Sequence, residues 1–543
     1  MMKKEITSIL FFLLIAATFT GCRKKEEVSI IPQPVNMEMK RGIFVINRET
    51  KIVVDGDVEA NLKTAAWVAE QIRKASGMGL AVVSGGPKIK NSICLVQGSV
   101  GDNHPEGYEL IVDRAGIEIR GEEAGIFYGM QTLLQLLPSE IYSSSLVKNV
   151  AWEVPQVHIT DAPRFPWRGM HLDVSRHFFP VEFIKKYIDL LAMHKLNVFH
   201  WHIVDDQGWR MEVDKYPLLT EKGAWRDGSM EGWDYFVGPP VEGGPVYGGY
   251  YTQEDIREIV QYAAERFITV VPEIEMPGHS RAALDAYPEL SCSGKPFDPE
   301  GATHHYLPPY CAGKEETFRF LEDVLTETME LFPSEYIHIG GDEVPKERWE
   351  VCPDCQRRVR DEGLENTREL QSYFITRIEK FVNARGRKII GWDEILEGGL
   401  APNAAVMSWR GIEGGISAAR AAHPVVMSPV AHCYFNHCQV PDPADSKVPC
   451  GEYTSLEEIY LYEPIPDTLN SEEAGFIMGA QGNVWTEMIK TPGQVEYMAL
   501  PRMSALAEVV WSHRESRDYT GFSVRMDAHY LRLDQMGVNY FKE

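Results

Sequence analysis

The chain lacks several features that mark large classes of proteins. It has no basic excess, because 54 Lys and Arg residues stand against 79 Asp and Glu residues, a net charge of −25 over 543 residues. Binding to nucleic-acid phosphates needs a basic face, so this balance argues against a nucleic-acid partner and disfavours an anionic substrate. The sequence contains no internal repeat and no low-complexity block. With 44% apolar and 10% aromatic residues it is not disordered, and its length suggests two to four folding units.

The N-terminal apolar run, at residues 9–19, is too short to span a bilayer, which takes ~20 helical residues. Two lysines precede it, and the pattern is that of a secretory signal. The run ends in Thr-Gly-Cys22, similar to the cleavage box of bacterial lipoproteins. We expect a signal peptide at 1–21, lipidation of Cys22 and a polar tether at 22–30; a plain signal peptide is the alternative. Membrane contact would then occur only through the lipid anchor of an exported, outer-membrane protein, periplasmic or at the cell surface.

Eight cysteines remain beyond Cys22 in a chain whose export would permit disulfides. Cys292 and Cys311 bracket a loop rich in glycine and proline, and could close it as a disulfide. Cys352-Pro-Asp-Cys355 is a lone C-x-x-C, and the three cysteines further on do not supply the usual spacing of a second zinc-binding pair. A local disulfide or two free thiols is therefore favoured over a zinc half-site.

The first folding unit is predicted at residues 31–160. Short β-rich runs alternate there with two helical patterns, which fits a small α+β domain. The predicted strands are 43–46, 51–54, 92–97, 108–112 and 116–120, and the predicted helices are 60–76 and 125–137. Pro155 and Pro163 flank a predicted connection, after which the pattern changes.

From 161 to 543, apolar strand-like runs alternate with amphipathic helical patterns, which predicts an α/β fold: a (β/α)8 TIM barrel with a C-terminal helical segment. The predicted strands are 170–174, 198–203, 269–274, 336–339, 388–392, 405–409, 425–428 and 477–481, and helices are predicted at 180–194, 253–266, 315–331 and 367–385. A doubly wound open sheet is the alternative, but it would normally carry a glycine-rich phosphate loop after its first strand. The sequence has no such loop.

Polar and aromatic residues follow nearly every predicted barrel strand, at the end where the chemistry of such barrels gathers. These runs are 173–177, 200–210, 273–279, 338–343, 392–394, 409–410, 434–436 and 485–487. Tryptophan stacks on the apolar C–H faces of sugar rings, while arginine and carboxylates bind sugar hydroxyls. The pattern indicates an uncharged carbohydrate ligand.

The adjacent pair Asp342-Glu343 is the sharpest catalytic signal. Gly340 and Gly341 precede it and permit a turn that can bring both carboxylates to one pocket. Most glycosidases use two carboxylates on opposite sides of the scissile bond, whereas an adjacent pair suits catalysis in which the sugar's own 2-acetamido oxygen attacks the anomeric carbon. Glu343 would protonate the leaving oxygen and then activate water, while Asp342 would hold the acetamide N–H. A bare Asp-Glu pair would indicate a solvated turn; its place in His-x-Gly-Gly-Asp-Glu favours catalysis.

Three motifs resemble those of glycoside hydrolase family 20, the β-N-acetylhexosaminidases. They are His-Ile-Gly-Gly-Asp-Glu at 338–343, Leu-Asp-Val-Ser-Arg-His at 172–177 and His-Trp-His-Ile-Val-Asp-Asp at 200–206. The resemblance covers residues 30 to 515, including the small N-terminal domain. It implies an exo-acting enzyme without a cofactor that removes terminal β-linked GlcNAc or GalNAc from oligosaccharides or glycoconjugates, through an oxazolinium intermediate and with retention.

The resemblance also implies a role for each matching residue. Glu343 is the general acid/base and Asp342 orients the acetamido group. The implied substrate-binding residues are Arg176 on the 3- and 4-hydroxyls, Asp205 and His279 as a relay toward the acid/base, Trp392, Trp409 and Trp485 as aromatic walls, Tyr434 on the acetamide carbonyl, and Asn436 and Glu487 on hydroxyls. Asn436 departs from the family pattern, which has aspartate there, and so carries no charge for hydroxyl binding.

Two other functions fit parts of the pattern. His200 and His202 lie on one strand face and could bind a metal as in barrel amidohydrolases or deacetylases, but that family has its H-x-H on the first strand and here it is on the second. Packing and hydrogen bonding around the pocket floor is the favoured role, and no metal site is predicted. A non-catalytic glycan-binding lipoprotein is disfavoured because Asp342 and Glu343 are both present.

Overall fold

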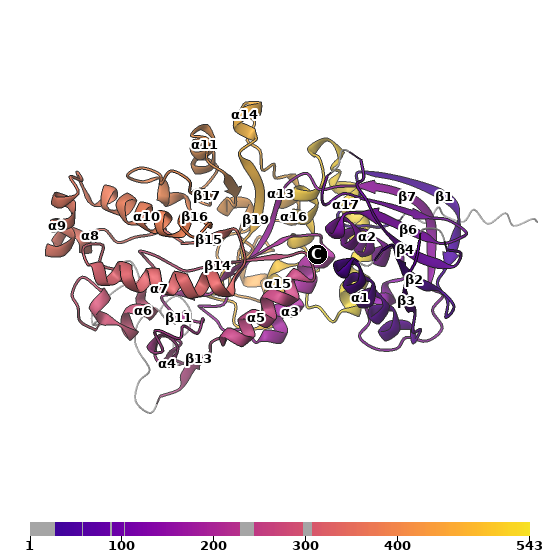
Figure 1. Ribbon diagram of the computed structural model, residues 1–543, viewed down its shortest axis with the longest axis horizontal. Helices are drawn as coiled ribbons and strands as arrows, with labels where there is room; N and C mark the ends of the chain where they lie inside the picture. Colours follow the sequence, from indigo (N-terminus) through magenta and orange to yellow (C-terminus); the bar gives the residue numbers. More distant parts are fainter. Residues whose placement is uncertain are drawn as a thin grey trace, which may run out of the picture.

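The computed structural model describes residues 28–56, 58–86, 89–101, 104–228, 244–296 and 307–542. The predicted signal peptide, Cys22 and most of the predicted tether lie outside these residues. Within them, no helix combines the length and apolar character that crossing a membrane requires. Figure 1 shows two units, a sheet domain on the right and a closed barrel on the left.

The N-terminal unit is a mixed seven-stranded sheet with the order β1-β7-β5-β6-β4-β2-β3. Its strands are β1 (Asn36–Val45), β2 (Lys51–Val54), β3 (Ala81–Ser84), β4 (Ser92–Gln97), β5 (Tyr108–Val112), β6 (Ile117–Gly121) and β7 (Glu153–Asp161). Helices α1 (Glu59–Ser76) and α2 (Glu123–Leu136) pack against it. Every second residue of β5 and β6 is buried, as expected when one face of a sheet lies under a helix. The predicted α+β domain and both of its helices are confirmed.

Strand β7 runs through most of the predicted connection between Pro155 and Pro163, so that prediction is wrong. Pro155 lies inside β7 and pairs with Ile43 of β1, at a register shift between Met39 and Ile43. The ladder is irregular there, so it tolerates a residue that lacks an N–H. Strand β3 was also missed, because its four residues form a short edge strand.

The second unit is the predicted barrel, with eight parallel strands in a closed ring. The strands are β8 (Trp167–Asp173), β9 (Val198–His202), β14 (Thr269–Glu273), β15 (Tyr336–His338), β16 (Lys388–Trp392), β17 (Ala405–Ser408), β18 (Val425–Met427) and β19 (Ile477–Gly482). Predicted helices appear as α3 (Val181–Met193), α5 (Gln253–Ala264), α7 (Glu315–Leu331) and α10 (Thr367–Asn383). All residues of β8 and β9 are buried, since helices cover the outside of the barrel and side chains fill its inside.

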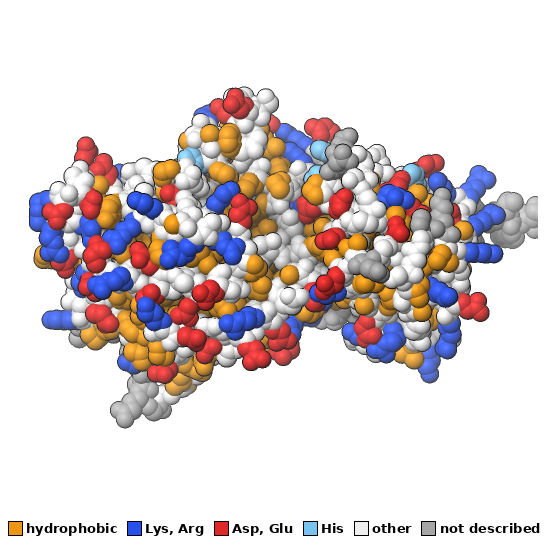
Figure 2. Space-filling model, viewed as in Figure 1, with side chains coloured by type: hydrophobic (Ala, Val, Ile, Leu, Met, Phe, Trp, Pro, Cys, Tyr) orange, Lys and Arg blue, Asp and Glu red, His pale blue; other side chains and the backbone are white. Residues whose placement is uncertain are grey.

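Further elements lie in the loops and at the C-terminal end. They are β10 (Val204–Asp205), β11 (Gly208–Trp209), β12 (Trp225–Asp227), β13 (Val246–Gly248), α4 (Leu218–Glu221), α6 (Arg281–Ala286), α8 (Glu347–Val351), α9 (Pro353–Asp361), α11 (Glu413–Arg420), α12 (Val430–Cys433), α13 (Leu456–Leu461), α14 (Ser471–Ala474), α15 (Pro492–Ala499), α16 (Arg502–Trp511) and α17 (Tyr519–Gln535). Over the face shown in Figure 2, basic and acidic side chains are interspersed.

Buried polar contacts connect the two units. Lys195 Nζ, at the end of α3, lies 2.9 Å from Asp161 Oδ2 of β7, and both side chains are fully buried. The indole of Trp511 donates to the other oxygen of Asp161 at 2.9 Å. Helix α17 runs back beside α2 (Figure 1), where Arg532 donates to the carbonyl of Gln135 at 2.8 Å. The small domain is therefore fastened to the barrel by paired charges and hydrogen bonds.

One cysteine prediction agrees with the structure and another does not: Cys352 and Cys355 are two free thiols, one of the two favoured alternatives. The structure joins Cys438 to Cys450 in a disulfide, while Cys292 and Cys311, expected as a possible disulfide, are both free thiols. The C-x-x-C pair, Cys352 and Cys355, also has other cysteines beside it. The fold brings residues 292 and 311, which lie 63 and 41 positions from their cysteine partners, into contact with it.

Candidate active site

Two glycines form the turn that presents the acidic pair at the end of β15. Gly340 and Gly341 have φ values of 64° and 96°, in the left-handed region that favours glycine. A Cβ on Gly340 would lie 1.7 Å from Glu275 Oε2, and one on Gly341 would lie 2.6 Å from Ile395 Cγ2. A side chain at either position would therefore force the buried Glu275 or Ile395 side chain to move, in addition to the strain of a positive φ. The predicted turn at the glycine pair is confirmed.

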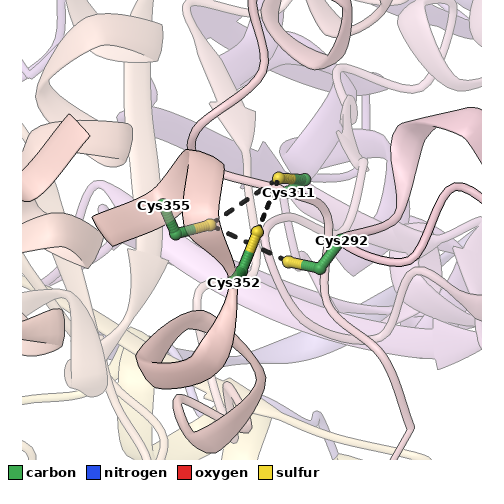
Figure 3. Close-up of side chains that lie close together, drawn as sticks. All are labelled: Cys292, Cys311, Cys352 and Cys355. Atoms are coloured by element: carbon green, nitrogen blue, oxygen red, sulfur yellow. Dashed lines mark hydrogen bonds between the residues drawn. The ribbon is translucent and has the colours of Figure 1, made fainter. Parts of the chain in front are cut away.

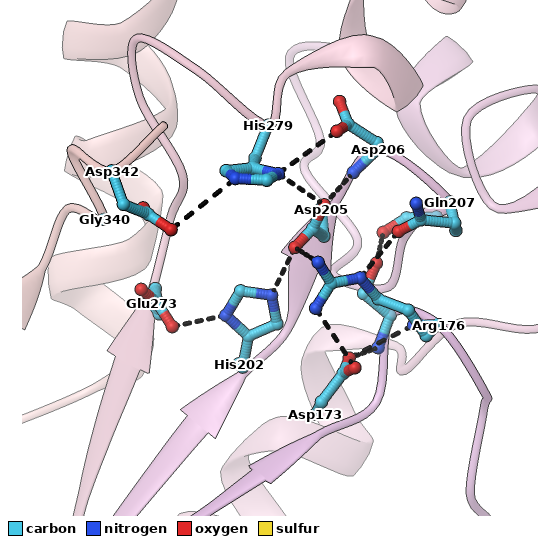
Figure 4. Close-up of polar contacts among 12 residues, drawn as sticks. Asp173, Arg176, His202, Asp205, Asp206, Gln207, Glu273, His279, Gly340 and Asp342 are labelled. Carbon is cyan, nitrogen blue, oxygen red and sulfur yellow. Dashed lines mark hydrogen bonds and ion pairs between the residues drawn. The ribbon is translucent and has the colours of Figure 1, made fainter. Parts of the chain in front are cut away.

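The acidic pair meets a single nitrogen of His279. Nε2 of this imidazole lies 3.5 Å from Asp342 Oδ2 and 3.6 Å from Glu343 Oε2. On its other side, Nδ1 lies 3.2 Å from Asp205 Oδ1 and 3.1 Å from Asp206 Oδ2 (Figure 4). Burial lowers the pKa of His279, but the carboxylates of Asp205 and Asp342 outweigh it and hold that pKa well above the usual value. A charged imidazolium thus connects the two sets of carboxylates.

Asp342 and Glu343 have different surroundings. Asp342 is 9% exposed, and burial raises its pKa to about 7 although His279 opposes this shift. Among the residues described by the structure, none hydrogen-bonds to Asp342 Oδ1. The Glu343 side chain is 61% exposed, and its hydrogen bond with His279 lowers its pKa. Between the two pKa values the pair holds one proton, which without ligand resides on Asp342.

Ten of the eleven predicted site residues line one cavity of about 150 Å³. They are Arg176, His279, Asp342, Glu343, Trp392, Trp409, Tyr434, Asn436, Trp485 and Glu487. Pockets for drug-sized ligands span roughly 300–1,000 Å³, so this one suits a single small ring. The eleventh residue, Asp205, lies behind the cavity. Its Oδ2 is 2.8 Å from Arg176 Nη2 and 2.8 Å from His202 Nε2. The structure thus brings the set together, while the role of each residue stays a prediction.

Arg176 is held by acceptors around its guanidinium. Nε donates to Gln207 Oε1 at 2.7 Å, and Nη1 lies 3.3 Å from Asp173 Oδ2 (Figure 4). Nη1 also lies 3.8 Å from Glu487 Oε1, and the cation sits 5.1 Å from the centre of the Trp485 ring. A planar guanidinium fixed in this way is suited to hydroxyl recognition in one orientation.

Four aromatic rings form a continuous wall. The ring centroids are 5.8 Å apart for Trp392 and Trp485, 6.3 Å for Tyr434 and Trp485, and 6.1 Å for Trp409 and Tyr434, whose planes are nearly parallel. Burial raises the pKa of Tyr434 well above its usual value, so its phenol remains a hydrogen-bond donor. Asn436 Oδ1, in the same cavity, is buried without a hydrogen-bond partner in the described part of the chain. The wall can hold the apolar face of a sugar beside free polar groups.

Sequence reasoning missed the carboxylates that position the tryptophans. Glu273 Oε1 accepts from the Trp392 indole at 2.8 Å, and Glu394 Oε2 accepts from the Trp409 indole at 2.8 Å. Glu394 had no role assigned from the sequence; burial and nearby Asp342 raise its pKa to about 8. The position of Glu273 on strand β14 could have indicated where its side chain points, because alternate residues of a strand point to the same side.

The histidines of β9 form a hydrogen-bonded floor. His202 contacts Glu273 through Nδ1 and Asp205 through Nε2. Burial lowers the pKa of His202, but these carboxylates outweigh it and raise that pKa to about 10. Both ring nitrogens of His202 are thus engaged by carboxylates. His200 Nδ1 accepts from Gln481 Nε2 at 2.8 Å, and both histidines are fully buried, out of reach of a substrate. The geometry favours hydrogen bonding over the metal alternative.

Comparison with known families matches residues 165–514 to the catalytic domain of glycosyl hydrolase family 20 and residues 27–162 to domain 2 of the same family. The chain belongs to glycosyl hydrolase family 20. It is 46% identical to a beta-hexosaminidase of Porphyromonas gingivalis, over 94% of this chain and 64% of that one, and so spans less than two thirds of that relative. It is 32% identical to a beta-N-acetylhexosaminidase of Cellulomonas fimi, over 95% and 96% of the two chains.

Among solved structures, this family 20 chain is similar to the exo beta-N-acetylglucosaminidase of Vibrio harveyi in complex with N-acetylglucosamine. The TM-score is 0.82 at 32% identity, covering 95% of this chain and 78% of that one. The predicted family and the predicted fold, a TIM barrel preceded by a small domain, are both confirmed.

Proposed function

We propose that this family 20 protein is an exo-acting β-N-acetylhexosaminidase, which removes terminal non-reducing β-linked GlcNAc or GalNAc from oligosaccharides or glycoconjugates. A cavity of about 150 Å³ supports this, because it has room for one sugar unit at a chain end. The names of the relatives agree, and the V. harveyi structure contains N-acetylglucosamine.

The reaction is substrate-assisted and retains the anomeric configuration. The observation that carries this proposal is that Asp342 and Glu343 both lie within 3.6 Å of the same nitrogen of His279. They are therefore on one side of the pocket, whereas a protein nucleophile and a general acid flank the bond from opposite sides. The acetamido oxygen of the bound sugar attacks the anomeric carbon, and the glycosidic bond breaks as Glu343 protonates the leaving oxygen.

Asp342 and Tyr434 aim the acetamido group. Asp342 Oδ1, without a partner in the described residues, accepts the acetamide N–H, and the Tyr434 phenol donates to the carbonyl oxygen. Negative charge on Asp342 then stabilises the oxazolinium ring that forms beside it. Water attacks the anomeric carbon of this intermediate, Glu343 takes the water proton, and the ring opens to release the amino sugar with retention.

Substrate binding moves the shared proton to Glu343. The acetamide N–H stabilises the ionised form of Asp342, and the sugar excludes water from the exposed Glu343 carboxyl, which raises its pKa. The proton that rests on Asp342 in the free enzyme is thus available on Glu343 when the leaving oxygen needs it.

Aryl β-glycosides that differ only at C2 and C4 test this proposal. We expect cleavage of 2-acetamido sugars, no cleavage of the matching β-glucoside, and inhibition by a thiazoline that mimics the cyclised intermediate. Equal rates on the β-glucoside, or a trapped sugar ester on the protein, would contradict acetamide participation.

We also propose that the protein is exported and anchored to the outer membrane through lipid on Cys22. The N-terminal lipoprotein-like box supports this. Cells given labelled palmitate should incorporate it into the wild-type chain but not into Cys22→Ala, and only the wild type should partition into detergent. An unlabelled wild-type chain in the soluble fraction would show that the cysteine is incidental.

A further inference from the structure

Four cysteine sulfurs meet in the segments that follow β14 and β15, and none of these cysteines lines the site cavity (Figure 3). Cys292 follows the short helix Pro288–Leu290, Cys311 precedes α7, and Cys352 and Cys355 lie at the start of α9. The Sγ–Sγ distances are 3.8 Å for Cys292–Cys355, 3.8 Å for Cys311–Cys352 and 3.6 Å for Cys311–Cys355. All four sulfurs lie within 4.8 Å of one another.

This spacing is that of a tetrahedral metal site. Zinc binds thiolate sulfur at about 2.3 Å, so four sulfurs around one ion lie ~3.8 Å apart. A disulfide instead requires sulfurs ~2.05 Å apart. We propose that Cys292, Cys311, Cys352 and Cys355 bind one Zn²⁺ ion, as a structural site in which all four ligands are thiolates.

The surrounding backbone holds the ligands in place. A Cβ on Gly313 would lie 2.2 Å from the carbonyl carbon of Asp354, so the loop after Cys311 packs directly on the first turn of α9. Lys314 Nζ donates to the carbonyl of Ser291 at 2.6 Å, beside Cys292. These contacts bring together three segments of the chain that supply the ligands, as a preorganised site requires.

The burial of the ligands matches a structural rather than a catalytic ion. Cys311, Cys352 and Cys355 are buried and Cys292 is half-buried. Four protein ligands leave no position for water or substrate, which distinguishes closed structural sites from catalytic ones. Zinc in this place would stabilise the fold without taking part in glycoside hydrolysis.

The proposed ion would also connect two catalytic loops. Cys292 and Cys311 lie between β14 and α7, the stretch that contains His279, while Cys352 and Cys355 lie between β15 and α10, after Glu343. The ion would therefore tie the segment carrying the imidazole to the segment carrying the acid/base. Loss of the ion should mainly lower the thermal stability of the protein, because none of the four ligands lines the substrate cavity.

Metal analysis of the purified wild-type chain tests the proposal. We expect one zinc per chain by elemental mass spectrometry, and four thiols that react with a mercurial only as zinc is released. Exchange with Co²⁺ should produce the charge-transfer and strong d–d bands of a tetrahedral thiolate site, with turnover within about twofold of the zinc form. A chain without metal that takes up neither Zn²⁺ nor Co²⁺, or one whose intact mass shows the four cysteines as two disulfides, would overturn the proposal.

Variants locate the ion. Cys292→Ser and Cys355→Ser should lower the zinc content and the Tm, while Cys94→Ser, which changes a buried free thiol in the sheet domain, should keep one zinc per chain. Full zinc content in both cluster variants would place the metal elsewhere. The wild-type measurements stand even if a variant fails to fold.

Discussion

The alkaline limit of activity tests the proton shared by Asp342 and Glu343. Burial raises the pKa of Asp342 to about 7, while His279 lowers the pKa of Glu343. Between these values the pair carries one proton, and in the proposed mechanism Glu343 uses this proton to protonate the leaving oxygen. As the pH rises through about 7 this proton is lost, so kcat/KM for an alkyl glycoside should fall above pH 7.

The substitution Asp342→Asn should move this limit by more than about two pH units. Asparagine holds no titrating proton, and Glu343 beside charged His279 keeps a pKa below its ordinary 4.5. The alkaline limb of kcat/KM should therefore shift from about 7 to below 4.5. The rate at the optimum should also fall by about 10²–10³, since the negative charge that faces the proposed oxazolinium is gone.

The assay is the pH profile of kcat/KM for an alkyl 2-acetamido β-glycoside, in the wild type and in two variants. Glu394→Gln is the matched control, because burial and Asp342 raise the pKa of Glu394 to about 8 and make it the competing source of an alkaline limb. An aryl glycoside with an acidic leaving group needs no protonation and should show a flattened limb in the wild type. A limb that stays near pH 7 in Asp342→Asn, or that moves only in Glu394→Gln, would refute this reasoning.

Four other predictions concern single positions. Glu343→Gln should lower kcat on an oligosaccharide by roughly 10²–10⁴, and wild-type rates would remove Glu343 from the acid/base role. Asn436→Asp should change the ratio of kcat/KM between GlcNAc and GalNAc substrates, because Asn436 Oδ1 lines the cavity with no partner in the described residues; an unchanged ratio means the departure is silent. Asp161→Ala leaves a fully buried lysine without its carboxylate and should lower the free energy of unfolding by ~3–5 kcal/mol in urea titration, and a loss under ~1 kcal/mol would contradict this. Gly340→Ala should abolish activity, because its Cβ would lie 1.7 Å from the buried carboxyl group of Glu275. The control Gly386→Ala, at φ of 75° with open space around the Cβ, should lose only ~1–2 kcal/mol of stability. Equal losses of activity and of stability in the two variants would show that backbone strain matters and the clash does not.

Local patterns predicted the parts of the fold that local physics controls. The helix expected at 315–331 has the same bounds as α7, because its apolar face repeats along the segment. The turn at Gly340 and Gly341 was also predictable, since glycine adopts left-handed φ values without the steric cost that a Cβ brings. Pro155 led to a wrong prediction because a residue without an N–H argues against a strand unless the pairing with its neighbour is irregular. Here the irregularity lies in β1, and the sequence of β7 does not reveal it.

The catalytic set itself came from the motifs and the family they resemble, and the closed barrel explains why residues so far apart in sequence line one cavity. The sequence by itself determined which segments form the eight barrel strands and which polar residues follow them, since side-chain patterns and glycine conformations are properties of neighbouring residues. Only the tertiary structure decided which of these residues meet: the two indoles on Glu273 and Glu394, the two carboxylates on one nitrogen of His279, and the four sulfurs of the proposed zinc site. Such contacts join positions tens of residues apart, and their distances follow from how strands close into a ring and loops pack on its rim.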